Sequence, residues 1–396
     1  MRTVTGATTS GELRPHNLVR LLRAAHDGAG RATRSELTRD LGLARGTAAV
    51  LVADLTEARL AEERPAPQRA RGRPTAILGP HPEGPLALAV DLREDAWTTA
   101  TAEIGGGLTV REERPHHGNP PEAVLGDLAT AIDRWLTELG PRVVSVGVAL
   151  PGPIRDGRVV DIPHLSWHDV PAAEILRAGA TPVALGNDAA LAGLAEARRG
   201  ALRGVGVGLH FHVDFDLGGT LLVDGSPLHG ARGTTGEFGH MPLGGSDLPC
   251  DCGAVGCWSL QVGANALLRA TGASVEPARG RADALRILAG AAEGDPRCAA
   301  ALQEVARAFG AGAAALVNAL DPQRVTLSGL GVQLHEQATD AFTAAYENGL
   351  MAFRREEPPQ VVPAALGGDA TLVGASELAF DAFLTPEGLT AWQAAR

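Results

Sequence analysis

Apolar residues in the first 60 positions recur at helical spacing in three short stretches. These stretches are residues 18–25, 37–41 and 48–55. Thr33 and Glu36 precede the second stretch at the spacing of a capping box, and Gly42 separates it from the third. Three short helices with a tight turn between the last two are the outline of a helix-turn-helix. The polar residues 1–15 are expected to precede the first helix.

A basic, proline-rich segment follows the third helix over residues 62–75. It contains Arg69, Arg71 and Arg73 and suits the wing of a winged helix-turn-helix. Glycines and prolines between positions 79 and 85 predict a linker. Residues 1–80 are therefore expected to form a DNA-binding domain.

The pattern changes at Leu86, where strand-like apolar runs begin to alternate with helical stretches. The runs cover residues 86–90, 143–148, 183–185, 205–211, 220–223 and 325–327. The helical stretches cover residues 121–139, 189–199, 282–292 and 296–320. This alternation predicts an α/β fold. About 310 residues are too many for one simple unit, so we expect two lobes with a cleft between them.

Charge is distributed unevenly along the 396 residues, whose formal net charge is −11. The chain contains no lysine, and residues 1–80 hold 13 Arg and 8 Asp or Glu, which gives +5. Residues 81–396 hold 22 Arg and 38 Asp or Glu, which gives −16. A basic head on an acidic body fits a nucleic-acid module joined to another domain, although chance unevenness explains it equally well. Because no apolar run reaches the roughly 18 residues that a membrane span needs, we expect a cytoplasmic protein with no membrane partner.

Three of the four cysteines are clustered in the segment Cys250-Asp-Cys252-Gly-Ala-Val-Gly-Cys257, downstream of His240. Three thiolates and one imidazole complete a tetrahedral zinc site, and the two glycines allow a tight loop. Four protein ligands leave no open position, so the zinc is expected to be structural. The alternative is a loop of reduced cysteines without metal.

Several segments together resemble the ROK family of repressors, open reading frames and kinases. They are Gly236-Glu-Phe-Gly-His240 with the cysteine loop, Val146–Pro153, Gly186-Asn-Asp-Ala-Ala190 and Asn318–Pro322. The resemblance covers about residues 16 to 380 and implies a winged helix-turn-helix followed by a two-lobed, actin-like sugar kinase fold of the ribonuclease H-like type. On this basis the first lobe is expected over residues 86–200, completed by a C-terminal helix at about 374–396. The second lobe, with the zinc loop, is expected over residues 201–373.

The resemblance also implies a sugar site. Asp188 matches the catalytic base of the family's kinases, and Asn187, Glu237 and His240 match ligands of sugar hydroxyls or their supports. Asp188 is also a candidate helix N-cap, and the two roles are compatible. His164 stands where the family often has Asn, so it is either a ligand contact or a surface histidine. Ser259 replaces a sugar-binding Glu, while His210 and His212 are interpreted first as sheet residues.

Both phosphate-binding loops depart from the kinase pattern. In kinases of the family the resemblance implies Asp-x-Gly-Gly-Thr for the first loop, which here reads Asp91-Leu-Arg-Glu-Asp95. It implies Gly-Thr-Gly for the second loop, which here reads Asp214-Phe-Asp216 before Leu217-Gly-Gly219. Glycines allow backbone N–H groups to approach phosphate, and carboxylates repel it, so we expect no ATP binding. The alternative keeps Asp91, Asp214 and Asp216 as a magnesium site.

We therefore expect a sugar-responsive repressor that binds operator DNA as a homodimer or homotetramer and has no active catalytic residue, Asp188 being a vestigial base. Base contacts are expected from Arg45 and Thr47 at the start of the third helix, and minor-groove contacts from Arg69, Arg71 and Arg73. The alternatives are an ATP-dependent sugar kinase with an added DNA-binding head, and a regulator that a protein partner controls instead of a sugar.

Overall fold

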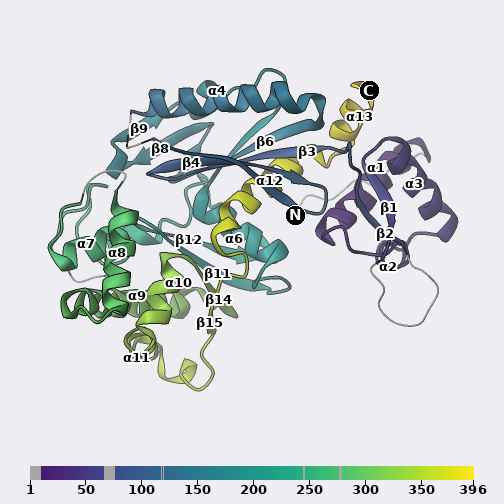
Figure 1. Ribbon diagram of the computed structural model, residues 1–396. Coiled ribbons are helices and arrows are strands. Elements are labelled where there is room, and N and C mark those ends of the chain that lie inside the picture. Colours follow the sequence, from purple (N-terminus) through teal and green to yellow (C-terminus); the bar gives the residue numbers. More distant parts are fainter. Residues whose placement is uncertain (1–9, 67–75, 117, 119, 244–245, 276–278) are drawn as a thin grey trace.

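The computed structural model describes residues 10–66, 76–116, 118, 120–243, 246–275 and 279–396. The chain begins with the helices α1 (Ser10–Asp27), α2 (Arg34–Asp40) and α3 (Arg45–Glu57), followed by the strands β1 (Ala61–Pro65) and β2 (Ala76–Pro80) (Figure 1). Two expectations are corrected here. Helix α1 already begins at Ser10, and the expected linker at 79–85 starts later, because Gly79 and Pro80 pair with β1.

The capping box of α2 is confirmed. Thr33 Oγ1 accepts a hydrogen bond from the Glu36 backbone N–H at 3.2 Å, and Glu36 Oε2 accepts one from the Thr33 N–H at 2.8 Å. Strands β1 and β2 form an antiparallel hairpin at the place expected for the wing. The arginines predicted for the wing, Arg69, Arg71 and Arg73, lie outside the described residues.

The first large sheet has the strand order β10-β6-β3-β4-β5. Its strands are β3 (Leu86–Leu92), β4 (Ala96–Glu103), β5 (Leu108–Pro115), β6 (Val143–Leu150) and β10 (Val183–Asn187). The long helix α4 (Pro121–Leu139) packs on one face through a shared apolar core. The short strands β7 (Ile154–Arg155), β8 (Arg158–Ile162) and β9 (Trp167–Val170) form a separate sheet, and the short helix α5 (Ala172–Ile175) lies after them.

The second large sheet has the order β13-β12-β11-β14-β15. Its strands are β11 (Val207–Val213), β12 (Leu217–Val223), β13 (Ser226–Pro227), β14 (Arg324–Gly329) and β15 (Gln360–Pro363). Five helices lie over it and share its core: α7 (Ala264–Thr271), α8 (Gly280–Ala292), α9 (Pro296–Leu320), α10 (Leu330–Gln337) and α11 (Thr339–Gly349).

Two helices lie between the large sheets (Figure 1). They are α6 (Asp188–Arg199), which packs on β11 and β12, and α12 (Ala370–Phe383), which packs on β3 and β6. Their backbones touch at Gly374, where a Cβ would lie 2.0 Å from the carbonyl oxygen of Leu191. Only glycine fits at this crossing, so α6 and α12 pack with no side chain between them.

The C-terminal segment expected as one helix over residues 374–396 consists of two. Helix α12 ends at Phe383, and α13 (Pro386–Ala394) begins after the N-cap Thr385. Helix α13 packs on α1, and Trp392 Nε1 donates to the carbonyl of Ala58 at 2.7 Å. The head therefore shares an apolar core with α12 and α13. No described helix has both the length and the apolar character that crossing a membrane requires.

Candidate ligand cleft and metal site

A cleft between the two large sheets brings together all five residues predicted to bind ligand. Its lining includes Asn187, Asp188, Glu237, His240 and His164. Seven carboxylate side chains line it: Asp91, Glu94, Asp161, Asp188, Asp214, Asp216 and Glu237. Arg93 is the one arginine in the same lining, so the cleft has a strongly acidic wall.

Asn187 and Asp188 lie where β10 ends and α6 begins. The cap of α6 is Asn187, not Asp188 as the sequence suggested: Asn187 Oδ1 accepts from the backbone N–H of Ala190 at 3.0 Å. Asp188 is the first helical residue, and its carboxylate accepts from the N–H of Ala189 at 2.7 Å and from the Asn187 amide at 3.0 Å. The capping role of Asn187 leaves the second carboxylate oxygen of Asp188 for a ligand.

Burial raises the pKa of Asp188 from 3.8 to about 7. The hydrogen bond from the Ala189 N–H lowers this pKa only in part, and the nearby carboxylates of Asp91, Asp214 and Glu237 raise it further. A carboxyl group with a pKa near neutrality can accept a proton from a hydroxyl group. The side chain therefore has the chemistry of a general base, as the resemblance implied. It equally has the chemistry of a hydrogen-bond acceptor for a bound sugar.

Glu237 is the N-cap of a short 3-10 turn, Phe238–His240, and His240 is its last residue. The two ring nitrogens of His240 face different groups: Nδ1 lies 3.7 Å from Cys250 Sγ, and Nε2 lies 4.0 Å from Glu237 Oε2. The histidine can therefore ligate a metal through Nδ1 while Nε2 faces the cleft. Burial raises the pKa of Glu237 to about 7, and the negative charge of Asp161 contributes to the increase.

His164 is not a free surface histidine, because its Nε2 pairs with the carboxylate of Glu94 and its Nδ1 lies 3.6 Å from Asp216. Burial alone would lower the pKa of His164, but Glu94 and Asp216 outweigh it and raise that pKa. Glu94 was not predicted as a site residue. The available signal was its position in the stretch that replaces the first phosphate loop.

The first replaced loop is held by an internal arginine. Arg93 lies 3.8 Å from Asp91 and donates to Asp95 at 3.2 Å and to Glu113 at 2.7 Å. Asp91, at the end of β3, is 6% exposed, and burial raises its pKa to about 6 although Arg93 opposes this. No glycine remains in this turn to expose N–H groups to a phosphate.

The second replaced loop is the turn between β11 and β12. Here Asp214 accepts a hydrogen bond from the guanidinium of Arg281, which lies near the start of α8. Asp91, Asp214 and Asp216, the expected alternative magnesium ligands, thus each have a cationic or imidazole partner within the chain.

Ser259 occupies the position where the resemblance implies a sugar-binding Glu. It is 3% exposed, and its hydroxyl has no hydrogen-bond partner among the described residues. The side chain lines the cleft, so a ligand hydroxyl could satisfy this oxygen.

His210 and His212 are sheet residues on β11, as interpreted. His210 is fully buried, and its two ring nitrogens contact Thr326 at 2.8 Å and Ser328 at 3.0 Å. His212 contacts Ser328 at 2.8 Å and lines the cleft. Burial lowers the pKa of both rings, so they are neutral at pH 7.

The four predicted metal ligands converge. One donor atom from each of His240, Cys250, Cys252 and Cys257 lies within 4.8 Å of every other, and no second such group occurs in the part of the chain that the structure describes. Cys252 Sγ and Cys257 Sγ are 3.6 Å apart, too far for a disulfide but near the roughly 3.8 Å expected of two thiolates on a tetrahedral zinc. Gly256 makes the loop possible, since a Cβ there would lie 2.5 Å from the carbonyl of Ser246. The cluster can hold a metal ion.

The predicted recognition helix is α3. Arg45 and Thr47 lie exposed in its first turn, and Val50, on the following turn, is 53% exposed. Both predicted base-contacting side chains are thus accessible to solvent at the start of the helix, and their contact with DNA stays a prediction.

The ROK family model matches residues 94–382, more than half of the chain. The chain belongs to the ROK family. Its fold matches a crystal structure of a ROK family transcriptional regulator, a homologue of the E. coli Mlc protein, with a TM-score of 0.75 and 22% identity over 97% of this chain and 100% of that one. This confirms the expected fold, a winged helix-turn-helix head followed by the two-lobed, actin-like body.

The proteins similar to this ROK protein include both glucokinases and repressors. It is 28% identical to the glucokinase of Streptomyces coelicolor, over 74% of this chain and 97% of that enzyme. It is 23% identical to the xylose repressor of Bacillus subtilis, over 89% of this chain and 92% of the repressor. The repressor alignment is longer than the kinase alignment by 46 residues, 357 against 311.

Proposed function

We propose that this ROK protein is a sugar-responsive transcriptional repressor without phosphotransferase activity. The observation that carries the proposal is the combination of a helix-turn-helix head with phosphate loops that have lost their glycines. In these loops Asp91 lies beside Arg93, and Asp214 accepts a hydrogen bond from Arg281. The length of the alignment with the xylose repressor supports it.

Operator DNA is the proposed target of the head. Arg45 and Thr47 would contact bases, and the exposed Val50 suits a thymine methyl group. Arg69, Arg71 and Arg73 are proposed for the minor groove. Because a two-fold operator needs two heads, we propose at least a dimer.

A sugar is the proposed effector, bound by Asn187, Asp188, Glu237, His240 and His164 in the cleft. The acidic wall favours a neutral or cationic sugar over a sugar phosphate, because each close pair of like charges is unfavourable in a partly buried site. The metal is proposed to be zinc. It would hold the Cys250–Cys257 loop and His240 Nδ1, and it would fix the orientation of the Nε2 that faces the ligand.

DNA binding by the full-length protein to fragments from its own upstream region tests the proposal. Two salt concentrations and a panel of sugars and sugar phosphates are needed. We expect specific, salt-sensitive binding that one neutral or amino sugar shifts. Absence of specific binding at either salt would contradict the repressor function.

A second candidate is an ATP-dependent sugar kinase, favoured by the pKa of about 7 at Asp188 and by the glucokinase relatives. Release of ADP that depends on sugar would support it. A third candidate is a regulator controlled by a protein partner, favoured by Ser259 in place of Glu. Specific DNA binding that no sugar shifts would support the third.

A further inference from the structure

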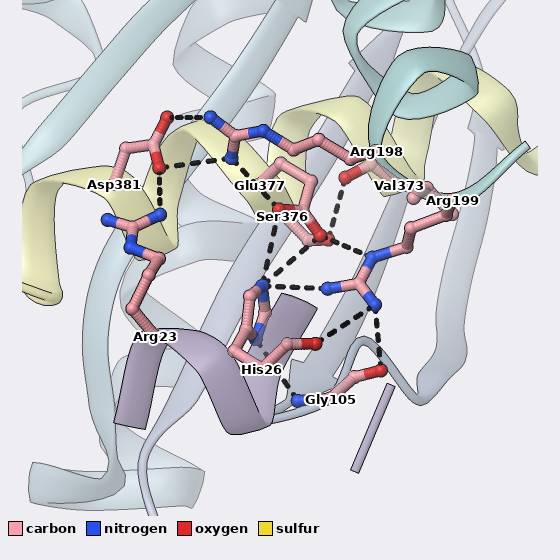
Figure 2. A network of polar contacts seen from close by, with 9 residues as sticks. All are labelled: Arg23, His26, Gly105, Arg198, Arg199, Val373, Ser376, Glu377 and Asp381. Atoms are coloured by element: carbon pink, nitrogen blue, oxygen red, sulfur yellow. Dashed lines mark hydrogen bonds and ion pairs between the residues drawn. The ribbon is translucent and has the colours of Figure 1, made fainter. Parts of the chain in front are cut away.

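Helix α6 connects the ligand cleft with the DNA-binding head. Its first turn carries Asp188 and the cap Asn187 in the cleft, and its last turn carries Arg198 and Arg199. At 1.5 Å per residue, its 12 residues span about 18 Å. The last turn ends in a cluster of polar contacts with α1 of the head (Figure 2).

Glu377 of α12 is the centre of this cluster and is fully buried. Its carboxylate accepts from Arg199 Nε at 2.5 Å and from Arg198 at 2.9 Å, and it lies 3.2 Å from His26 Nε2 on α1. The Nδ1 of His26 accepts from the backbone N–H of Gly105 at 3.0 Å, and its Nε2 contacts both Glu377 and Arg199 Nη2, the latter at 2.8 Å. Arg199 also donates to the carbonyls of Gly105 at 2.9 Å and His26 at 3.3 Å.

A second set of contacts lies at the more exposed edge of the cluster. Asp381 of α12 accepts from Arg198 at 2.8 Å and from Arg23 of α1 at 2.5 Å. Both sets therefore join the same three helices, α1, α6 and α12 (Figure 2).

An apolar core also holds this junction together, and a buried ion cluster stabilises a fold no better than well-packed apolar side chains of the same volume. Unlike apolar side chains, guanidinium groups form good hydrogen bonds only when their acceptors lie in particular directions. The cluster thus fixes the register of α1 against the last turn of α6. The backbones of α6 and α12 are also in direct contact at Gly374, so we expect these two helices to move together.

We propose that α6 transmits occupancy of the cleft to the head, through the contacts of Arg198 and Arg199 with Glu377, Asp381 and α1. This inference rests on the proposed sugar-sensing function. A ligand that binds Asn187 Oδ1 competes with the hydrogen bond from the Ala190 N–H, and one that binds the second carboxylate oxygen of Asp188 contacts the first residue of α6 directly. A resulting shift of α6 reaches α1 directly, and DNA affinity changes if the ligand binds one position of α6 more tightly.

The test measures DNA affinity of the full chain by fluorescence anisotropy, with and without saturating D-xylose or D-glucose, and sugar affinity by calorimetry. Variants are the double change Arg198→Gln with Arg199→Gln, and Asp381→Asn at the exposed edge. Arg158→Gln is the matched control, since it removes an exposed arginine–aspartate pair between β8 and β9 that includes no residue of α1, α6 or α12. Unfolding temperature and metal content establish that each variant is folded.

We expect the wild type and the control to show a sugar-dependent change in DNA affinity of roughly 5-fold or more. The double variant should keep its sugar affinity, but sugar should change its DNA affinity by less than about 2-fold. Asp381→Asn should show a sugar effect between that of the double variant and that of the wild type. If the double variant does not fold, Asp381→Asn decides. A full sugar effect in the folded variants overturns this inference alone, whereas a wild type that binds DNA but responds to no sugar overturns the proposed function with it.

Discussion

The guanidinium of Arg281 donates a hydrogen bond to the carboxylate of Asp214 in the turn between β11 and β12. A kinase of this family would be expected to hold a phosphate at this turn. Here the turn holds an internal ion pair, and Arg93 fills the corresponding role beside Asp91. An arginine that is paired within the chain neutralises a carboxylate but offers little to an incoming phosphate.

We therefore expect no sugar-dependent ADP release. A coupled assay with ATP, magnesium and a panel of neutral and amino sugars measures it, and the Streptomyces coelicolor glucokinase is a suitable positive control. Turnover in the wild type that disappears in Asp188→Asn would contradict the prediction, because only a working base makes that carboxylate indispensable.

Asp188→Asn should also change stability in a pH-dependent way. The folded state raises the pKa of Asp188 from 3.8 to about 7, so the folded protein holds this proton more tightly than the unfolded chain. Stability is thus lost as the pH rises from about 4 to about 7, and the loss is complete above that range. The variant should unfold about 2–4 °C higher than the wild type near pH 8, and the two should agree near pH 4.

Thermal unfolding at both pH values measures this difference. Asp340→Asn, an exposed change on α11, is the control and should shift the unfolding temperature at neither pH. If the variant is instead destabilised near pH 8, the hydrogen bond from Ala189 stabilises the charged carboxylate by more than its burial destabilises it.

Metal analysis of protein purified without chelator should find about one zinc per chain. Cys257→Ser should lose the metal and destabilise the second lobe by more than ~2 kcal/mol, since a structural zinc contributes folding free energy. Cys298→Ser is the matched control, because Cys298 lies on α9 apart from the cluster. Equal metal content in the two variants would exclude the proposed ligand set.

If Arg45 contacts a base, Arg45→Ala should weaken DNA binding by about 1–3 kcal/mol. If it contacts phosphate, the variant should lower the slope of log affinity against log salt concentration by about one. Binding isotherms at several salt concentrations distinguish the two contacts. Arg158→Ala on the body should leave the affinity unchanged. The same measurement on Arg71→Ala and Arg73→Ala tests the predicted wing contacts.

Local patterns predicted much of the fold. Helix α9 and helix α4 have the bounds that the apolar periodicity indicated, and the predicted capping box at Thr33 and Glu36 is present. Strands β4 and β5 were missed. In β4 both faces are buried, so its polar threonines gave no alternating pattern, while β5 is a mostly exposed strand.

The candidate metal site was the part of the chemistry that sequence alone predicted best, because its four side chains lie within 18 consecutive residues and their donor atoms converge in the structure. The residues of the cleft could be named from motifs, but their pairing could not. Glu94 and His164, or Asp214 and Arg281, are separated by about 70 residues, and only the packing of two lobes brings them together.

The junction between head and body was decided by tertiary structure alone. His26, Arg199 and Glu377 lie on helices far apart in the chain, and each reads in sequence as an ordinary polar position on a helix. Their burial and mutual contact depend on the crossing of α6 and α12 at Gly374 and on the packing of α1 against α12. Sequence determines what a side chain can donate or accept, and the long-range packing of the helices determines which partner it meets.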